Sequence, residues 1–212
     1  MAVRKILVLG GTGGTGGHVI RQALARGHIV TALVRDPGRV SVTSDRLHVR
    51  TGSVTEAGES LHAALAGQDA VISALGRGTS FTSGGLIARS MALVVPAMEA
   101  QGVRRVILTS AFGVGETIRD VPLLPRLFIR LKLQDLYRDK AAGEALLRQS
   151  ALEWTIVYPS ALTNGLSAGR MRAGERLALR GFPRTARTDA ATFLLDQVDD
   201  ASYVRKGVLI SA

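Results

Sequence analysis

The stretch Gly10-Gly11-Thr12-Gly13-Gly14-Thr15-Gly16-Gly17 decides how this chain folds. It follows the apolar run 3–9 directly and leads directly into a helical pattern over 18–26. In that setting Gly10 permits a tight turn, Gly13 the close approach of a pyrophosphate, and Gly16 the packing of the helix on the strand. Free N–H groups at the helix start favour an anion. The setting disfavours a linker that binds nothing and predicts a dinucleotide site formed by Gly10, Thr12, Gly13, Gly14, Thr15 and Gly16.

The end of the next apolar run, 29–34, indicates which dinucleotide binds. NAD-binding folds usually place an acid there for the ribose hydroxyls, but this chain has Arg35 in the terminal position. A guanidinium at that point would pair with the 2′-phosphate of NADP, and Arg39 could assist. The alternative is a solvated Arg35 with Asp36 binding the ribose of NAD. We therefore expect NADP (NADPH), with NAD as the less favoured cofactor.

Short apolar runs alternate with helical patterns along the whole chain. Strands are expected over 3–9, 29–34, 47–50, 70–75, 105–109, 154–158 and 208–210, and helices over 18–26, 59–66, 86–101, 127–148 and 189–197. Strands that are apolar on both faces and separated by helices imply a parallel sheet covered on both sides. Right-handed crossovers then give an α/β doubly wound parallel sheet, the Rossmann fold. The length of 212 residues suits a single domain over 1–212.

Two stretches, 112–126 and 162–187, are expected to be irregular and to form a substrate pocket, because ligands of such sheets bind beyond the carboxyl ends of the strands. An apolar pocket rimmed by arginines would suit a flat, apolar, anionic compound. Its expected lining is Phe112, Leu123, Leu124, Leu162 and Phe182. Alternatively, the leucines are ordinary helix core, or the basic stretch 123–133 lies on a membrane surface, which its poor helical periodicity disfavours.

Composition excludes several other classes of function. The net charge is +10, but the basic residues are dispersed and only 4% of residues are aromatic, so nucleic-acid binding is disfavoured. The absence of cysteine excludes disulfides and thiolate metal sites, and the four histidines lack metal-ligand spacing, so no metal is expected. No apolar run reaches the roughly 20 residues that span a bilayer. We expect a cytoplasmic monomer or homodimer that acts on an apolar small molecule.

Taken in order, several segments resemble the atypical short-chain dehydrogenase/reductases of the NmrA-like NAD(P)-binding family. The segments that carry the resemblance are Gly10–Gly16, Ala32–Pro37, Ala70–Gly76, Leu108–Phe112 and Trp154–Thr163. The Thr-Ser-Ala-Phe segment at 109–112 and the small size are similar to the biliverdin IXβ reductase/flavin reductase-like branch.

The resemblance implies further cofactor contacts. The end of the fourth strand would line the adenosine ribose, and the fifth- and sixth-strand ends would flank the nicotinamide. Where the family often has Asp-Val after the third strand, this chain has Ser53-Val54, so that contact falls to the backbone. The residues implied are Ser53, Val54, Ala74, Leu75, Gly76, Thr109, Tyr158, Pro159, Ser160 and Leu162.

The candidate catalytic residues are Ser110, Lys140 and Tyr137. Classical members of the family carry Tyr-x-x-x-Lys, whereas Tyr137 and Lys140 are three residues apart and cannot both occupy the classical places. Lys140 followed by Glu144 resembles the lysine position of the atypical family, and Tyr137 is alternatively a helix-surface residue. Ser110 could orient a substrate or cap local backbone. A serine triad is disfavoured because no histidine follows His62.

These observations predict an NADPH-dependent oxidoreductase that transfers hydride to a flat, apolar acceptor such as a flavin, a quinone or a tetrapyrrole. The imperfect Tyr/Lys spacing leaves open an NADP(H)-binding redox-sensing regulator without turnover. A sugar-nucleotide epimerase fits poorly, because the larger C-terminal substrate domain of such enzymes is missing.

Overall fold

Eight strands form one sheet whose order identifies the fold. The computed structural model describes residues 2–56, 58–78, 80–165, 171–179, 181 and 183–212. The strands run in the order β3 (Leu47–Thr51), β2 (Ile29–Val34), β1 (Lys5–Leu9), β4 (Ala70–Ser73), β5 (Arg105–Thr109), β6 (Glu153–Pro159), β10 (Lys206–Ser211) and β8 (Arg172–Gly174). All neighbours are parallel except β8, which is antiparallel to β10. The predicted single α/β domain with a doubly wound sheet is confirmed.

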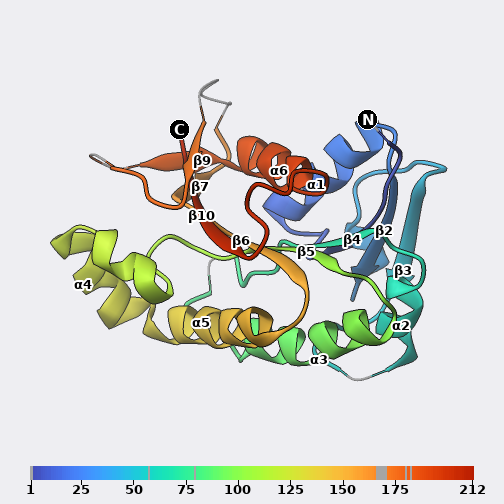
Figure 1. The fold of residues 1–212 in the computed structure, drawn as a ribbon, viewed down its shortest axis with the longest axis horizontal. Coiled ribbons are helices and arrows are strands. Elements are labelled where there is room, and N and C mark those ends of the chain that lie inside the picture. Colours follow the sequence, from blue (N-terminus) through green and yellow to red (C-terminus); the bar gives the residue numbers. More distant parts are fainter. Residues whose placement is uncertain (1, 57, 79, 166–170, 180, 182) are drawn as a thin grey trace.

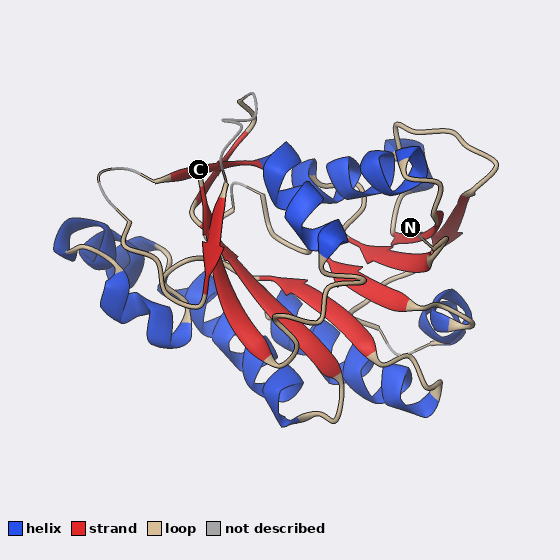
Figure 2. Ribbon diagram, turned by 45° about the horizontal axis from the view of Figure 1, so that its top comes forward, coloured by secondary structure: helices blue, strands red, loops and turns tan. Residues whose placement is uncertain are grey.

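Helices cover both faces of the sheet (Figures 1 and 2). One face carries α1 (Gly14–Ala25) and α6 (Arg187–Asp196), and the other carries α2 (Glu59–Leu65), α3 (Leu86–Ala100) and α5 (Gln134–Gln149). Alternate residues of β1 serve the two layers: Ile6 and Val8 face α1 and α6, whereas Leu7 and Leu9 join the core beneath α2, α3 and α5. Because both faces of β1 are buried, its run is apolar without alternation, as the sequence indicated.

The long helix predicted over 127–148 is in fact two helices, and this prediction was wrong. Helix α4 (Leu123–Lys132) ends where α5 begins, and Leu133 between them has φ −115° and ψ 8°. Asp135 of α5 accepts the N–H of Ser83 at 2.6 Å, and Asp139 accepts the N–H of Ile87 at 3.0 Å. These bonds fix α5 alongside the start of α3, while α4 leaves in another direction at the end of the molecule (Figure 1).

The two stretches expected to be irregular also contain regular structure. Residues 112–126 include a 3₁₀ helix (Gly115–Asp120) and the first turn of α4, and another 3₁₀ helix spans Pro37–Arg39. Within 162–187 lie β8 and β9 (Arg184–Ala186), and β9 pairs with β7 (Ala161–Thr163) in a separate two-stranded sheet. Strands of three residues are too short to show a hydrophobic period, which is why the sequence did not reveal them.

Over the described ranges, no helix has the length and apolar character needed to cross a membrane.

Candidate functional site

The glycine stretch forms a tight loop between β1 and α1. Gly10 has φ +82°, which L side chains rarely adopt, and its carbonyl accepts the N–H of Gly13 at 3.0 Å. A Cβ at Gly16 would collide with the carbonyl oxygen of Gly10, so only glycine lets α1 pack this closely. No side chain caps the start of α1 and no acid lies in its first turn. The N–H groups there are therefore left for an anion.

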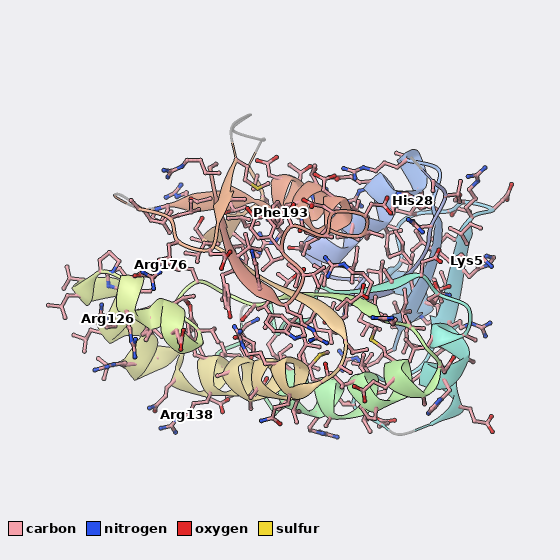
Figure 3. The ribbon with its side chains drawn as sticks, viewed as in Figure 1. Lys5, His28, Arg126, Arg138, Arg176 and Phe193 are labelled. Atoms are coloured by element: carbon pink, nitrogen blue, oxygen red, sulfur yellow. The ribbon has the colours of Figure 1, made fainter. Side chains whose placement is uncertain are left out.

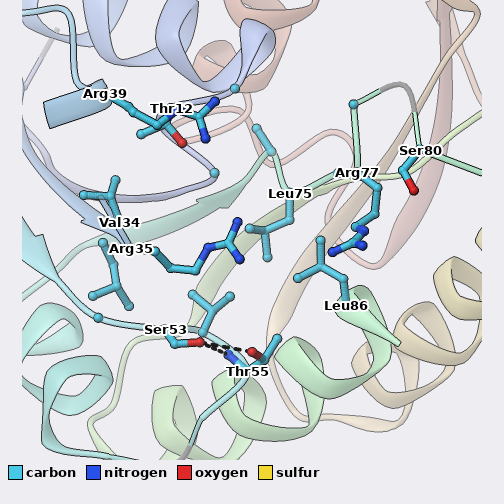
Figure 4. A pocket seen from close by; sticks show the side chains of 18 residues that line it. Thr12, Val34, Arg35, Arg39, Ser53, Thr55, Leu75, Arg77, Ser80 and Leu86 are labelled. Carbon is cyan, nitrogen blue, oxygen red and sulfur yellow. Dashed lines mark hydrogen bonds between the residues drawn. The ribbon is translucent and has the colours of Figure 1, made fainter. Parts of the chain in front are cut away.

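A first cavity, of about 380 Å³, opens over the carboxyl ends of β2, β1 and β4 (Figure 4). It contains ten of the cofactor residues expected from the sequence: Gly10, Thr12, Gly13, Arg35, Arg39, Ser53, Val54, Ala74, Leu75 and Gly76. Gly14, Thr15 and Gly16 are not in its lining and instead form the start of α1. The structure adds lining residues that the sequence did not indicate, notably Thr55, Arg77, Ser80 and Leu86.

Three arginines and no carboxylate belong to the described lining of this first cavity. Arg35 and Arg39 come from the segment after β2, and Arg77 comes from the segment after β4, on the other side of β1 (Figure 4). The Arg77 Nε donates to the carbonyl of Thr82 at 3.2 Å. Asp36, the alternative NAD ligand, lies outside the lining and accepts the N–H of Gly38 at 3.0 Å. The cavity therefore favours a ligand with more negative charge than one diphosphate.

Arg187 is a cation at the glycine loop that sequence reasoning missed. A Cβ added to Gly14 would lie 2.7 Å from its Cδ and 2.9 Å from its Nε, so this side chain rests on the first residue of α1. Its guanidinium also donates to Asn164 Oδ1 at 2.8 Å. Burial lowers the pKa of the nearby His18, and the charges of Arg21 and Arg187 lower it further. No sequence signal points to Arg187, because 173 residues separate it from Gly14 and only the packing of α6 on α1 brings them together.

A second cavity, of about 470 Å³, is mostly apolar and lies beyond β5 and β6. The sequence-predicted residues Ser110, Phe112, Tyr137, Pro159, Ser160 and Leu162 line it, together with Val121, Pro122, Pro125, Phe128, Ile129 and Leu133. Leu123 and Leu124 were expected here but are 76% and 79% exposed, since they point away from the cavity on α4. Arg184 is the one arginine in the described lining. Phe182 lies outside the described residues.

Beneath this cavity is a buried polar network centred on Glu144. Ser110 Oγ donates to Glu144 Oε1 at 2.5 Å, and Tyr158 Oη donates to Glu144 Oε2 at 2.6 Å. Arg148 donates to Tyr158 Oη at 2.9 Å and stacks on Trp154, with its guanidinium carbon 5.0 Å from the ring centre. Glu144 is only 4% exposed, so this carboxyl is buried between the sheet and α5.

The burial of Glu144 has a direct electrostatic consequence. Removal from water raises the pKa of the Glu144 carboxyl, although the hydrogen bonds from Ser110 and Tyr158 oppose the shift. The pKa of Tyr158 is raised as well, by burial and then by the Glu144 charge. Tyr158, expected beside the nicotinamide, lies in neither cavity lining and instead supports the carboxyl. A carboxyl that retains its proton above the usual range, one hydrogen bond from a cavity, is suited to proton transfer.

Tyr137 and Lys140 are not brought together as a catalytic pair. Tyr137 lines the second cavity, half-buried rather than on the helix surface, and its hydroxyl donates to the carbonyl of Phe112 at 3.1 Å. Burial raises the pKa of this phenol. Lys140 lines neither cavity, and burial lowers the pKa of its amine against the opposing charges of Glu144 and Asp139.

Thr109 and Ser160, both expected near the nicotinamide, differ in how their hydroxyls are satisfied. The Thr109 hydroxyl is buried without a hydrogen-bond partner among the described residues. Ser160 Oγ lies 2.7 Å from Thr185 Oγ1 and donates to Ser211 Oγ at 3.2 Å, so it is held by the sheet edge. Of the two, only Ser160 lines a cavity, and Thr109 lines neither.

A family model and two curated relatives match most of this chain. The model of a family described as NAD(P)H-binding matches residues 10–201. An uncharacterised chloroplast protein of Arabidopsis thaliana is 32% identical over 79% of this chain and 62% of its own length. Photosystem II assembly factor Ycf39 of Synechocystis is 27% identical over 76% of this chain and 46% of its own length. The chain thus spans about three fifths and about half of these relatives.

Solved structures share the fold at low sequence identity. An oxidoreductase from Lactococcus lactis superimposes with a TM-score of 0.82 at 20% identity, covering 97% of this chain and 90% of its own. ChuY from Escherichia coli, described as an anaerobilin reductase, gives 0.80 at 21%, covering 97% and 96%. A candidate NADH-flavin reductase from Streptococcus pneumoniae gives 0.78 at 24%, covering 98% and 99%. The family model confirms the NAD(P)-binding part of the expected resemblance, and the solved structures show a shared fold.

Proposed function

Since this chain belongs to the NAD(P)H-binding family, we propose that it is an NADPH-dependent oxidoreductase that reduces a flat, apolar acceptor of the flavin, quinone or tetrapyrrole kind. One observation carries the proposal: two cavities of opposite character lie at the carboxyl edge of one sheet. The first is lined by three arginines and the glycine loop, and the second is mostly apolar. An extended dinucleotide would use the first for its phosphates and adenosine and present its nicotinamide to the second.

The residues present fit NADPH. The crowding of Gly16 against Gly10 and the uncapped start of α1 suit a diphosphate, with Arg187 adding a charge at Gly14. Arg35, assisted by Arg39 and Arg77, would pair with the 2′-phosphate. The Asp36 carboxylate already accepts a hydrogen bond from the N–H of Gly38. Remaining contacts are proposed at Thr12, Gly13, Thr15, Ser53, Val54, Ala74, Leu75, Gly76, Pro159, Ser160 and Leu162, whereas Thr109 and Tyr158 line neither cavity and are not among them. When bound, NADPH supplies a hydride, and the second hydrogen of the product must arrive as a proton.

We propose that Glu144 supplies this proton and that Ser110 passes it to the acceptor. Ser110 Oγ lies 2.5 Å from Glu144 Oε1, and when Glu144 is ionised the serine hydroxyl donates to it. When Glu144 is protonated, the carboxyl donates to Ser110 and the serine proton is free to point into the second cavity. A transfer from Ser110 to the acceptor is then balanced by a transfer from Glu144 to Ser110. Ser110 lines the cavity and would be the catalytic residue, whereas Glu144 acts through it.

The acceptor class rests on the cavity and on the relatives. The second cavity offers few polar groups, with Ser110, Tyr137, Ser160 and Arg184 the main ones in its described lining. Arg184 would suit an anionic substituent on an otherwise apolar ring system. Among proteins of the same fold, one is described as an anaerobilin reductase and another as a candidate NADH-flavin reductase. The first description names a tetrapyrrole and the second a flavin, which are two of the acceptor classes proposed here. The cytoplasmic location expected from the sequence is kept as part of the proposal.

A second candidate is a regulator that binds NADP(H) without turnover. The arrangement of Tyr137 and Lys140 favours it, because the phenol is engaged by the Phe112 carbonyl and the lysine lies in neither cavity lining. A classical tyrosine acid is therefore missing.

One experiment separates the two candidates. The purified chain is titrated with NADPH and NADH, and NADPH oxidation is then followed with a flavin, a quinone and a linear tetrapyrrole. Tight NADPH binding with steady oxidation by any of these acceptors supports the enzyme. Tight binding with no oxidation by all three supports the regulator. Affinity for neither dinucleotide refutes both.

A further inference from the structure

Helix α4 exposes a continuous apolar face. Nine large apolar side chains are exposed in the described part of the chain, and five of them belong to this one helix. At 100° per residue these five fall within an arc of about 140°. They are Leu123 at 76%, Leu124 at 79%, Leu127 at 51%, Phe128 at 53% and Leu131 at 69% exposure. This corrects the expectation of poor periodicity over 123–133, because the helix ends at Lys132 and its apolar stripe is complete within that length.

Basic residues border this apolar face on both sides. On the helical wheel Arg126 and Arg130 flank one edge and Lys132 the other, and α4 contains no acidic residue. Arg138 and Arg176 lie at the same end of the molecule as Arg126, opposite Lys5 (Figure 3). Leucine and phenylalanine edged by arginine and lysine form the pattern of a helix that lies in the surface of an anionic membrane.

The charges argue against a second copy of this chain as the occupant. In a two-fold symmetric contact the same patch meets itself, so the arginines of one α4 would approach those of the other. With a net charge of +10, two copies repel each other over longer distances too. An anionic lipid surface presents the opposite charge.

The apolar face adjoins the second cavity. Pro125, Phe128 and Ile129 of α4 line that cavity, and Phe128 is at the same time about half exposed. A surface that covers the α4 face would therefore lie at the rim of the cavity.

We propose that α4 binds the surface of an anionic lipid bilayer, with its apolar face among the acyl chains and Arg130 and Lys132 at the headgroups. The Arg126 guanidinium is held by the carbonyls of Val121 and Arg119. An acceptor dissolved in the lipid would then reach the second cavity beside Phe128. Delivery of an acceptor rests on the proposed reductase function, whereas binding to the bilayer does not.

Flotation with vesicles tests the binding step. The full chain is mixed with vesicles of phosphatidylcholine, or of phosphatidylcholine and phosphatidylglycerol in equal parts, and the bound fraction is measured. We expect binding to the anionic vesicles and little to the neutral ones. Leu127→Gln combined with Leu131→Gln should weaken it by roughly tenfold or more, since two leucines no longer enter the lipid. Val3→Gln combined with Leu146→Gln, which replaces exposed apolar residues elsewhere, should bind as the unaltered chain does.

Charge is tested in the same way. Arg130→Gln combined with Lys132→Gln should reduce binding to anionic vesicles by roughly tenfold, at about 1 kcal/mol or somewhat less per cation. The matched pair Lys5→Gln and Arg50→Gln removes two exposed cations, one on β1 and one on β3, at the other end of the molecule from α4 (Figure 1), and should have little effect. Circular dichroism and NADPH binding verify the fold. If the Leu127/Leu131 variant unfolds, Leu123→Gln with Leu124→Gln replaces it.

Three outcomes would overturn the proposal. The unaltered chain could fail to float with anionic vesicles, or both leucine variants could float undiminished. Light scattering could instead show a dimer that the leucine substitutions dissociate, which would make the face a contact between copies. By contrast, loss of NADPH oxidation with vesicle binding intact would refute only the reductase function.

Discussion

The two halves of the sheet edge are built from opposite chemistry. Over β2, β1 and β4 the first cavity is bordered by glycine, small side chains and three arginines that come from segments after the strands. Over β5 and β6 the second cavity is mostly apolar, and one of its polar groups, Ser110, belongs to a buried network anchored on α5. The first half is a surface on which backbone and cations meet an anion. On the proposed function, the second half would shield the reaction from water and provide a proton path through Ser110 and Glu144.

Among the substitutions considered, the one at Gly16 should have the largest effect on cofactor binding and stability. Gly16→Ala should lose affinity for NADPH and NADH alike and lower stability by about 3 kcal/mol, because its Cβ meets the rigid backbone of Gly10. Gly17→Ala is the matched control: its Cβ would lie 3.6 Å from the flexible Arg21 side chain, and alanine favours the helix. Calorimetric titration and thermal unfolding measure both. Equal behaviour of the two variants would contradict the assignment of the loop.

Glu144→Gln should slow the reaction at the second cavity and leave cofactor binding in the first cavity unchanged. We expect kcat to fall roughly 10²-fold, as for loss of a general acid, with the Kd for NADPH unchanged. The unaltered protein should lose activity as pH rises through the raised pKa of Glu144, because the protonated form supplies the proton. The variant should show a flat profile. Ser110→Ala should likewise lower kcat with cofactor affinity kept. Identical pH profiles for Glu144→Gln and the unaltered protein would remove Glu144 from the proton path.

Arg35→Ala should affect only cofactor binding in the first cavity. Loss of one charge-assisted contact with the 2′-phosphate should cost about 1.5–3 kcal/mol in NADPH binding, with NADH binding nearly unchanged. Arg50→Ala, an exposed arginine on β3 that does not line the cavity, is the control. Binding titrations with both dinucleotides measure the effect. Equal losses for NADPH and NADH would reject Arg35 as the phosphate ligand.

A smaller effect of Glu144 should appear in stability. Burial raises its pKa in the folded state above the ordinary value of 4.5, so the folded chain holds this proton more tightly than the unfolded chain. The resulting stability is present below that value and is lost as pH rises through the folded pKa. Glu144→Gln lacks this loss, so its Tm relative to the unaltered protein should rise with pH. A Tm difference that is constant with pH would show that the carboxyl does not titrate abnormally.

Tyr137→Phe should give the smallest change. It removes the hydrogen bond to the Phe112 carbonyl and should cost about 1 kcal/mol of stability, with turnover altered less than about twofold. Denaturant unfolding and steady-state kinetics measure the two quantities. A collapse of turnover would make Tyr137 the acid and displace the Ser110–Glu144 path.

The sequence predicted the first half of the edge far better than the second. Strands buried on both faces read as apolar runs, and the glycine loop is contiguous, so the sheet and ten first-cavity residues could be named in advance. The Glu144 network joins residues that are 34 and 14 positions apart, and only folding brings them together. The break at Leu133 carries no glycine or proline, because it is set by the bonds that Asp135 and Asp139 make to the α3 region. Arg187 was missed for the same reason.

The position of Arg187 also determines how the protein responds to its ligand. The side chain that rests on Gly14 belongs to α6, near the C-terminal end, while Gly14 begins the first helix. A bound diphosphate would therefore tie opposite ends of the polypeptide to one group. By mass action, saturation with dinucleotide should then slow amide hydrogen exchange in α6 as well as in α1. The diphosphate site would thus be formed by two helices, by α1 through its first N–H groups and by α6 through the Arg187 guanidinium.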